Sequence, residues 1–212
     1  MTSILLEQLA FFFALFAIID PIAAVPIFIS LTYGETKKEV KRECLAAGLT
    51  MFIALVCALY FGDKILSIIG ADLNSFKVAG GIILFIVALK MLQLEIISFS
   101  TTQEERDHAA RRDVFVGAVP MGIPLLAGPG AMTLTIIAGH DNSFFGKTPY
   151  IFSIFVLAFL SYLCLRMAPY VSKKLGPSGM NIFTRVAGLL VSAVAVKLMT
   201  EGLLALLPGL GR

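Results

Sequence analysis

The sequence predicts an all-α membrane protein in which six transmembrane helices form two inverted three-helix repeats, with helices 1 and 4 broken at mid-membrane. Three observations indicate this fold class. Of the 212 residues, 58% are hydrophobic and only 15% are charged, a balance far more apolar than that of soluble domains. Six stretches approach the length of about 20 apolar residues that a span requires. A pair of prolines five residues apart occurs in the first and again in the fourth stretch.

The six predicted spans are joined by short connections. The spans cover residues 9–31, 44–62, 73–94, 114–138, 149–170 and 182–207. Two connections are charged, "GETKKEVKRE" at 34–43 and "STTQEERDHAARRD" at 100–113. We interpret the second as a solvated loop that divides the single membrane domain, residues 1–212, into a first repeat at 1–99 and a second repeat at 114–212.

Lysine and arginine are distributed unevenly between the two sides that these spans define. With the N-terminus outside, the inner connections hold nine of them: Lys37, Lys38, Lys41, Arg42, Arg106, Arg111, Arg112, Lys173 and Lys174. The outer connections and the C-terminus hold three: Lys64, Lys147 and Arg212. Because cytoplasmic loops carry the excess of these residues, we predict a multi-pass protein of the cytoplasmic (inner) membrane with both termini outside.

The two halves of the chain share motifs in matching places. The first span contains "DPIAAVP" at 20–26, and the fourth contains "IPLLAGP" at 123–129. The third span opens with "KVAGG" at 77–81, and the sixth opens with "RVAGL" at 185–189, where the small residues suit close helix packing. Since each half has an odd number of spans, the second half enters the bilayer from the opposite side. Such inverted repeats are common in secondary transporters.

The paired prolines interrupt spans 1 and 4 near the middle of the bilayer. At 1.5 Å per residue, Asp20 lies about 18 Å along the first span, close to the centre of a core about 30 Å thick. Pro124 lies at a similar depth in the fourth span. Proline removes a helical hydrogen bond, and each unsatisfied backbone group in lipid costs several kcal/mol. We therefore expect the two breaks to meet and to present their backbone groups to a substrate.

Each break also carries the residues that begin a second half-helix. Asp20 is suited to be an N-cap with Pro21 at the first helical position, and Gly128 precedes Pro129 in the same way. A helix N-terminus presents N–H groups and a partial positive charge. The first half-helices are expected to end in unpaired carbonyls, near 18–19 and 122–123. Such facing donors and acceptors suit a small zwitterion.

Our hypothesis is that the substrate carboxylate binds the N–H groups that follow Gly128, while Asp20 lies nearer to the ammonium. The predicted substrate-binding residues are Asp20, Pro21, Ala23, Val25, Pro26, Pro124, Ala127, Gly128, Pro129, Gly130, Ala131 and Met132. Asp20 is the only acidic residue deep in a span, and such residues mark functional sites in membranes. It could carry a coupling proton, bind a cation such as Na⁺, contact an amine, or serve only as a helix cap.

Other function classes lack their characteristic residues. A net charge of +3 is too small to indicate nucleic-acid binding. The HExxH motif of metalloproteases is absent, and Asp20 has no second deep carboxylate that would make an aspartyl dyad. The three cysteines, Cys44, Cys57 and Cys164, show no CxxC spacing and are interpreted as small buried hydrophobic residues. We predict no enzyme, no metal and no cofactor. A channel, or an exporter for another small solute, is the alternative function, and the oligomeric state is not predicted.

Four segments together resemble the MarC family of membrane proteins over essentially the whole chain. They are "DPIAAVPIF" at 20–28, "FKVAGGIILF" at 76–85, "PLLAGPGAM" at 124–132 and "RVAGLLV" at 185–191. The resemblance implies two inverted three-helix repeats with broken first and fourth helices around the substrate. It also implies transport of small neutral amino acids such as glycine and alanine. Many members carry glycine where this chain has Ala23, so a tighter site or a shifted selectivity is expected here.

Overall fold

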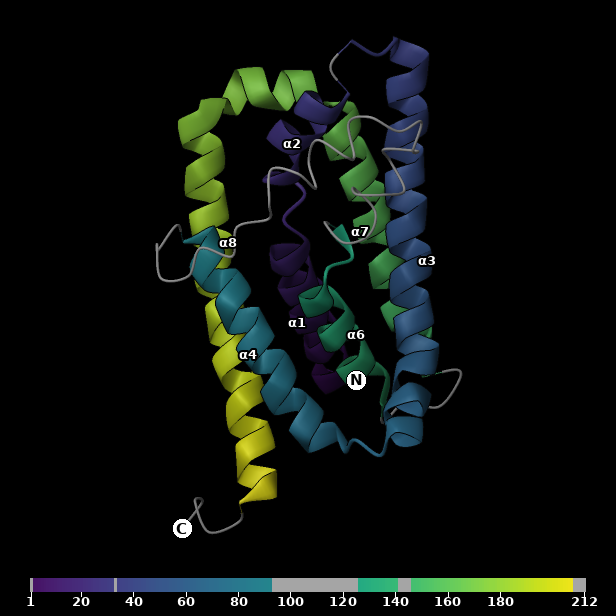
Figure 1. Cartoon of the computed structure of the whole chain (residues 1–212), viewed down its shortest axis with the longest axis vertical. Coiled ribbons are helices and arrows are strands. Elements are labelled where there is room, and N and C mark those ends of the chain that lie inside the picture. The colour runs from purple at the N-terminus through teal and green to yellow at the C-terminus, as the bar shows by residue number, and fades with distance from the viewer. Residues whose placement is uncertain (1, 33, 93–125, 141–145, 208–212) are drawn as a thin grey trace.

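The computed structural model describes residues 2–32, 34–92, 126–140 and 146–207, and the regular structure in these ranges is entirely helical (Figure 1). In chain order the helices are α1 (Thr2–Ile19), α2 (Ala24–Leu31), α3 (Lys37–Ile69), α4 (Leu73–Met91), α6 (Pro129–His140), α7 (Thr148–Arg166) and α8 (Ala168–Leu206). Four of them, α3, α4, α7 and α8, are long and apolar enough to span a membrane. The described residues are therefore all-α, as predicted, and four of their helices suit an integral membrane protein.

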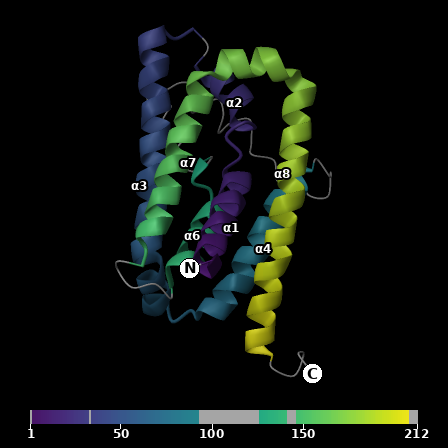
Figure 2. The same ribbon diagram turned by 180° about the vertical axis from the view of Figure 1, so that it is seen from behind.

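The helices lie roughly along one common direction. In Figures 1 and 2, α1 and α2 follow one another upward, α3 runs back down, and α4 rises again. In the second half, α6 descends, α7 rises, and the long part of α8 descends. As a result, the start of α1 and the end of α8 lie at the same end of the molecule. The closest neighbours are α4 with α8, and α3 with both α6 and α7.

The helix α3 begins earlier than the sequence analysis predicted. Residues 37–43 were assigned to a connection before a span at 44–62, yet α3 is helical from Lys37 for 33 residues. The cause is a capping box: the Thr36 side chain accepts from the Glu39 amide at 3.4 Å, and the Thr36 amide donates to Glu39 Oε2 at 2.7 Å. The charged stretch is therefore the first turns of a helix and not a loop.

The helix α8 also begins earlier than predicted, because the connection expected at 171–181 is itself helical. Its first part, up to 175, crosses the upper end of the molecule, and a corner then turns the chain downward (Figure 1). The corner is made by Gly176, with φ 63° and ψ 176°, followed by Pro177. A positive φ of this kind favours glycine, and proline cannot continue the preceding helix.

Small residues bring α4 and α8 into close contact. A Cβ atom added to Gly81 would lie 2.9 Å from the carbonyl oxygen of Ala195. One added to Gly188 would lie 3.2 Å from the carbonyl oxygen of Ala88. Because the backbones themselves approach this closely, both Val-Ala-Gly motifs serve helix packing, as the sequence analysis expected.

The buried hydrophobic residues form two clusters. The larger cluster joins α1, α2, α3, α6, α7 and the beginning of α8. The smaller one lies between α4 and α8 and includes Leu84, Ala88, Val191 and Ala195, with Ala17 of α1 against it. The pair of α4 and α8 therefore has a core of its own, and the end of α1 lies between the two cores.

Replacing Gly81 by alanine is expected to destabilise the protein. Helix propensity alone would favour alanine by about 1 kcal/mol, but the new methyl group would meet Met199 Cγ at 2.5 Å and the Ala195 carbonyl at 2.9 Å. Overpacking of this kind costs about 1–3 kcal/mol, so the Tm in detergent should fall. The matched control is Gly179→Ala, where the nearest neighbour of the added methyl group is Leu175 Cβ at 3.3 Å and no other described helix comes within 4 Å. An unchanged or raised Tm for Gly81→Ala would contradict the packing described above.

Candidate functional site

The first break lies where the sequence predicted it. The helix α1 ends at Ile19, and α2 begins at Ala24, after a turn formed by residues 21–23. Asp20 has a φ of 38°, and its Oδ1 accepts a hydrogen bond from the Ala23 amide at 3.2 Å. Aspartate is among the few residues that tolerate a positive φ, and its short side chain caps the turn. Asp20 thus caps the turn and not α2 itself: α2 begins at Ala24 with Ala23 as its N-cap, so the prediction of an Asp20 N-cap with Pro21 at the first helical position was wrong.

The second break has the predicted start of a half-helix. The helix α6 begins at Pro129, directly after Gly128. The amide of Met132 donates to the Gly128 carbonyl at 3.0 Å, so the prediction that this amide is available to a substrate was wrong. It forms the first intrahelical bond, whereas the amides of Gly130 and Ala131 lie in the first turn, where intrahelical partners are lacking. Pro124, and the expected end of the preceding half-helix at 122–123, lie outside the described residues.

The start of α6 touches the end of α1. A Cβ atom added to Gly130 would lie 3.4 Å from Ile18 Cγ2 and 2.7 Å from Leu84 Cδ2 of α4. The absence of a side chain at Gly130 thus permits the approach of three segments at one place. From this region α2 rises and α6 descends, so the two half-helices leave the middle of the molecule in opposite directions (Figure 1).

A cavity of about 160 Å³ lies beside the first break. It is lined by Ile18, Ile19, Asp20, Ala23, Ala24, Ile27, Val87 and Met91. Asp20 and Ala23 were among the predicted site residues. Val87 and Met91, which α4 contributes to the wall, were not predicted. Two apolar residues in an apolar helix carry no functional signal in the sequence.

Among the described residues that line this cavity, Asp20 is the only one with a charged group. Its side chain is 5% exposed, and its second oxygen, Oδ2, makes no hydrogen bond with any described residue. The Thr184 side chain of α8 lies close to the same carboxyl group, although no hydrogen bond to Oδ2 is formed. A buried carboxylate oxygen without a partner carries a desolvation cost that a proton, a cation or a substrate ammonium would relieve.

Two further helices hold the break in place. The Cys164 thiol of α7 donates to the carbonyl oxygen of Pro21 at 3.5 Å. The rings of Phe16 and Phe183 meet edge to face, with their centroids 6.3 Å apart. Cys164 is therefore more than the hydrophobic filler that the sequence suggested. Cys57 is exposed and not buried as predicted, because it lies on the outward face of α3, whereas Cys44 is buried as expected.

The other predicted site residues do not line this cavity. Val25, Ala127 and Ala131 are packed in the larger hydrophobic cluster. Pro21 and Gly130 are buried, Gly128 and Met132 are partly exposed, and Pro26 and Pro129 are exposed. Among the described residues no group of three or more metal-binding side chains occurs. His140, at the end of α6, pairs with Asp63 of α3 and so ties these two helices together.

Substitutions of Asp20 should separate its structural role from its charge. Asparagine keeps both the acceptor for the Ala23 amide and the tolerance of positive φ, so Asp20→Asn should unfold close to the Tm of the wild type. Glycine keeps only the backbone freedom and should lose a few tenths of a kcal/mol. Alanine loses both and should lose about 1 kcal/mol or more. Thermal unfolding in detergent checks this order, and an alanine variant as stable as the asparagine variant would contradict the cap.

Comparisons with known proteins agree with this architecture. The model of the "MarC family integral membrane protein" matches residues 6–207. The UPF0056 membrane protein YhcE of Escherichia coli (strain K12) is 35% identical over 204 residues, which are 94% of this chain and 93% of that protein. The UPF0056 membrane protein MJ1677 of Methanocaldococcus jannaschii is 36% identical over 201 residues, covering 91% and 93% of the two chains. No solved structure matches the chain. The chain is thus an integral, multi-pass membrane protein that belongs to the MarC family.

Proposed function

We propose that this protein is a secondary transporter that moves small neutral amino acids, such as glycine and alanine, across the cytoplasmic membrane by alternating access. One observation carries the proposal: Asp20, a buried carboxyl group with an unpartnered oxygen, lines a cavity at a helix break inside a membrane protein. Intramembrane carboxylates are costly and mark pathways for substrates and ions. Broken helices around a central site are typical of secondary transporters.

The chemistry of the two breaks suits a zwitterion. A substrate ammonium at Asp20 would supply the hydrogen-bond donors that Oδ2 lacks. The first turn of α6, with the amides of Gly130 and Ala131, would receive the carboxylate, which the positive end of the half-helix favours. The contact of Gly130 with Ile18 supports this arrangement, because it places the start of α6 beside the end of α1.

The cavity walls favour small, apolar side chains. Around Asp20 the lining is aliphatic, from Ile18, Ile27, Val87 and Met91 among others. Its volume of about 160 Å³ is well below the 300–1,000 Å³ typical of sites for drug-sized ligands. An additional charge on the substrate would lack a partner in this lining and would carry a desolvation cost.

The proposal includes six transmembrane helices in two inverted repeats. The contacts between α4 and α8 support it. Gly81 of the first motif faces Ala195, and Gly188 of the second motif faces Ala88. Each motif thus contributes a glycine to the contact of an antiparallel helix pair, which fits helices that enter the bilayer from opposite sides. The opposite directions of α2 and α6 fit the same relation (Figure 1).

Alternating access would involve the two hydrophobic cores. The cavity lies between α1 and α2, which belong to the larger core, and Val87 and Met91 of α4. Since most residues of the smaller core lie on α4 and α8, a movement of this pair relative to the other helices would open or close the cavity while the contact between α4 and α8 is kept. Such rocking of one bundle against another is a common mode of alternating access.

The proposed orientation places both termini outside. Seven described cations lie on the first turns of α3 or around the junction of α7 and α8, at the end of the molecule opposite the start of α1: Lys37, Lys38, Lys41, Arg42, Arg166, Lys173 and Lys174. This concentration of charge favours that end as the cytoplasmic one. A proton carried by Asp20 is the proposed coupling ion, with Na⁺ as the second candidate.

Counterflow in proteoliposomes tests the proposed function directly. Vesicles loaded with unlabelled alanine should accumulate labelled glycine or alanine transiently, whereas labelled leucine should accumulate much less. A carrier saturates and exchanges, but an open channel equilibrates its solute without an overshoot. Asp20→Asn should lose accumulation driven by a proton gradient, and unchanged accumulation would remove Asp20 from coupling. The absence of counterflow with all three amino acids would reject the proposed substrates.

Shortening Met91 should relax the selectivity for small side chains. Met91→Ala enlarges the cavity beside Asp20, so leucine should compete with labelled alanine at a concentration about tenfold lower than in the wild type. The matched control is Ile82→Ala, also on α4, whose side chain is 48% exposed and does not line the cavity. If leucine is excluded equally by Met91→Ala and by the wild type, the cavity is not the site that selects the side chain.

A further inference from the structure

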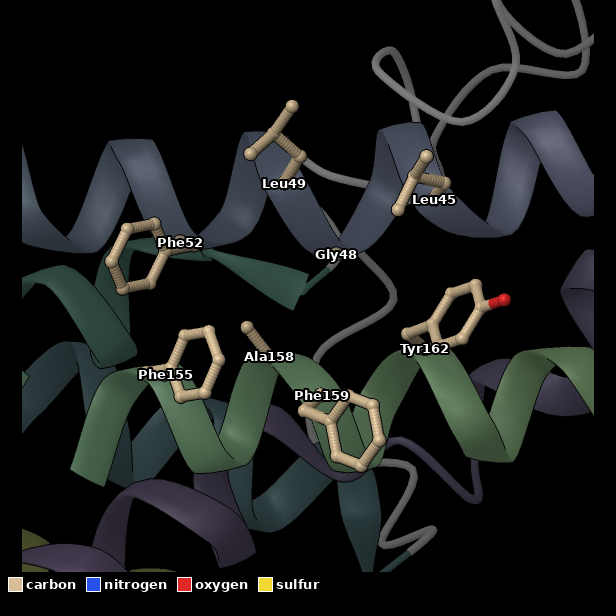
Figure 3. A pocket seen from close by; sticks show the side chains of 8 residues that line it. All are labelled: Leu45, Gly48, Leu49, Phe52, Phe155, Ala158, Phe159 and Tyr162. Carbon is tan, nitrogen blue, oxygen red and sulfur yellow. The ribbon is translucent and has the colours of Figure 1, made fainter. Parts of the chain in front are cut away.

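A second concave surface lies on the outside of the bundle, between α3 and α7 (Figure 3). Its walls are Leu45, Leu49 and Phe52 of α3, and Phe155, Phe159 and Tyr162 of α7. The volume is about 360 Å³, and none of its lining residues lines the cavity at Asp20. We name this surface the α3–α7 groove.

Small residues at the floor produce the groove. A Cβ atom added to Gly48 would lie 3.2 Å from the Ala158 carbonyl, so the two helices approach closely at this point. The larger side chains on either side stand outward and leave a trough between them, as Figure 3 shows. Several of these walls are about half exposed, for instance Leu49 at 55% and Phe159 at 52%. Since α3 and α7 are long and apolar enough to span a membrane, side chains that are this exposed among the described residues can contact lipid chains.

One end of the groove carries a positioned cation. Arg166 follows Tyr162 by one helical turn; its Nη1 donates to the Tyr162 hydroxyl at 2.6 Å, and its guanidinium lies 5.9 Å from the centre of that ring. Arginine has five N–H donors, and the tyrosine takes only one of them. Arg166 is exposed and forms no ion pair with a carboxylate in the part of the chain that the structure describes.

Further cations lie beside this end, among carboxylates that are held elsewhere: Glu39 is bonded to Thr36, and Glu43 is buried. Lys38, Lys41 and Arg42 lie on the first turns of α3, just before Leu45 at the groove. The start of α3 and the end of α7 are at the same end of the molecule (Figure 1). The groove therefore combines an apolar trough with a cationic end and a tyrosine between them, which is the order of chemistry across a membrane interface.

We propose that the α3–α7 groove binds an anionic phospholipid, with an acyl chain in the trough and the phosphate on Arg166. The planar guanidinium fork matches the geometry of a phosphate and donates to two of its oxygens at once. Tyr162 fixes the orientation of that fork, so little side-chain freedom is lost when the lipid binds. This site is independent of the transport function proposed above.

A second copy of the chain is the competing occupant, and the charges disfavour it. Two identical membrane proteins pair about an axis along the membrane normal, which keeps equivalent residues at the same depth. Pairing through this groove would therefore bring the cationic ends of both copies together. An anionic headgroup would neutralise the same charges.

Lipid binding to the purified protein in detergent tests the proposal. Native mass spectrometry compares dioleoylphosphatidylglycerol with dioleoylphosphatidylcholine, which has the same acyl chains but a zwitterionic headgroup. The wild type should prefer the glycerol lipid, and Arg166→Gln should reduce this preference about fivefold, the factor expected for one cation near an anionic surface. The matched control is Lys174→Gln, an exposed cation that stacks on Tyr170 away from the groove. An unchanged preference in Arg166→Gln, or an equal loss in the control, would overturn the proposal.

Two further variants keep the test decisive. If Arg166→Gln does not fold, Arg166→Lys keeps the charge but loses the fork, and its preference should lie between those of the wild type and a neutral residue. A benzophenone amino acid in place of Leu49 should form photocrosslinks to phospholipid. Crosslinks to a second copy of the chain would show that the groove is instead an interface between protomers.

Discussion

The need to satisfy backbone groups inside a bilayer is the constraint on which the rest of this structure depends. The chain between α1 and α2 leaves the helical conformation in an apolar environment, where each unpaired amide or carbonyl is costly. The Asp20 carboxylate relieves part of this cost by accepting a hydrogen bond from the Ala23 amide. The Cys164 thiol relieves another part by donating to the Pro21 carbonyl. Both partners are short side chains at fixed positions. Neighbouring side chains therefore stabilise the break in its observed conformation.

Close packing of small residues allows the neighbours to reach the break. Without side chains at Gly81 and Gly188, α4 and α8 share one narrow interface. That interface places Val87 and Met91 of α4 in the wall of the cavity. It also places Thr184 of α8 near Asp20. The missing side chain at Gly130 likewise allows the start of α6 to approach α1 and α4. The glycines thus determine how near the chemically active groups come to one another, although none of them carries a functional group itself.

The sequence predicted those parts of the fold that depend on local chemistry. Proline spacing located the end of α1 at Ile19 and the start of α6 at Pro129, because proline acts on its own helix. The start of α3 was missed although Thr36 and Glu39 form a recognisable capping box, since the surrounding lysines favoured a loop. Val87, Met91 and Thr184 could not have been identified in advance. Their roles arise from packing between distant segments, and their residue types are ordinary for membrane helices.

The corner at Gly176 and Pro177 divides α8 into a short first part, residues 168–175, and a long second part. The first part carries two exposed residues, Tyr170 and Lys174. The Lys174 ammonium lies 5.7 Å from the centre of the Tyr170 ring. Such a pair is suited to the boundary between headgroups and acyl chains. Because of the corner, residues 168–175 can lie along a membrane surface while the rest of α8 crosses the bilayer. A change in bilayer thickness would therefore be accommodated first at this corner, where the surface-lying residues 168–175 join the rest of α8.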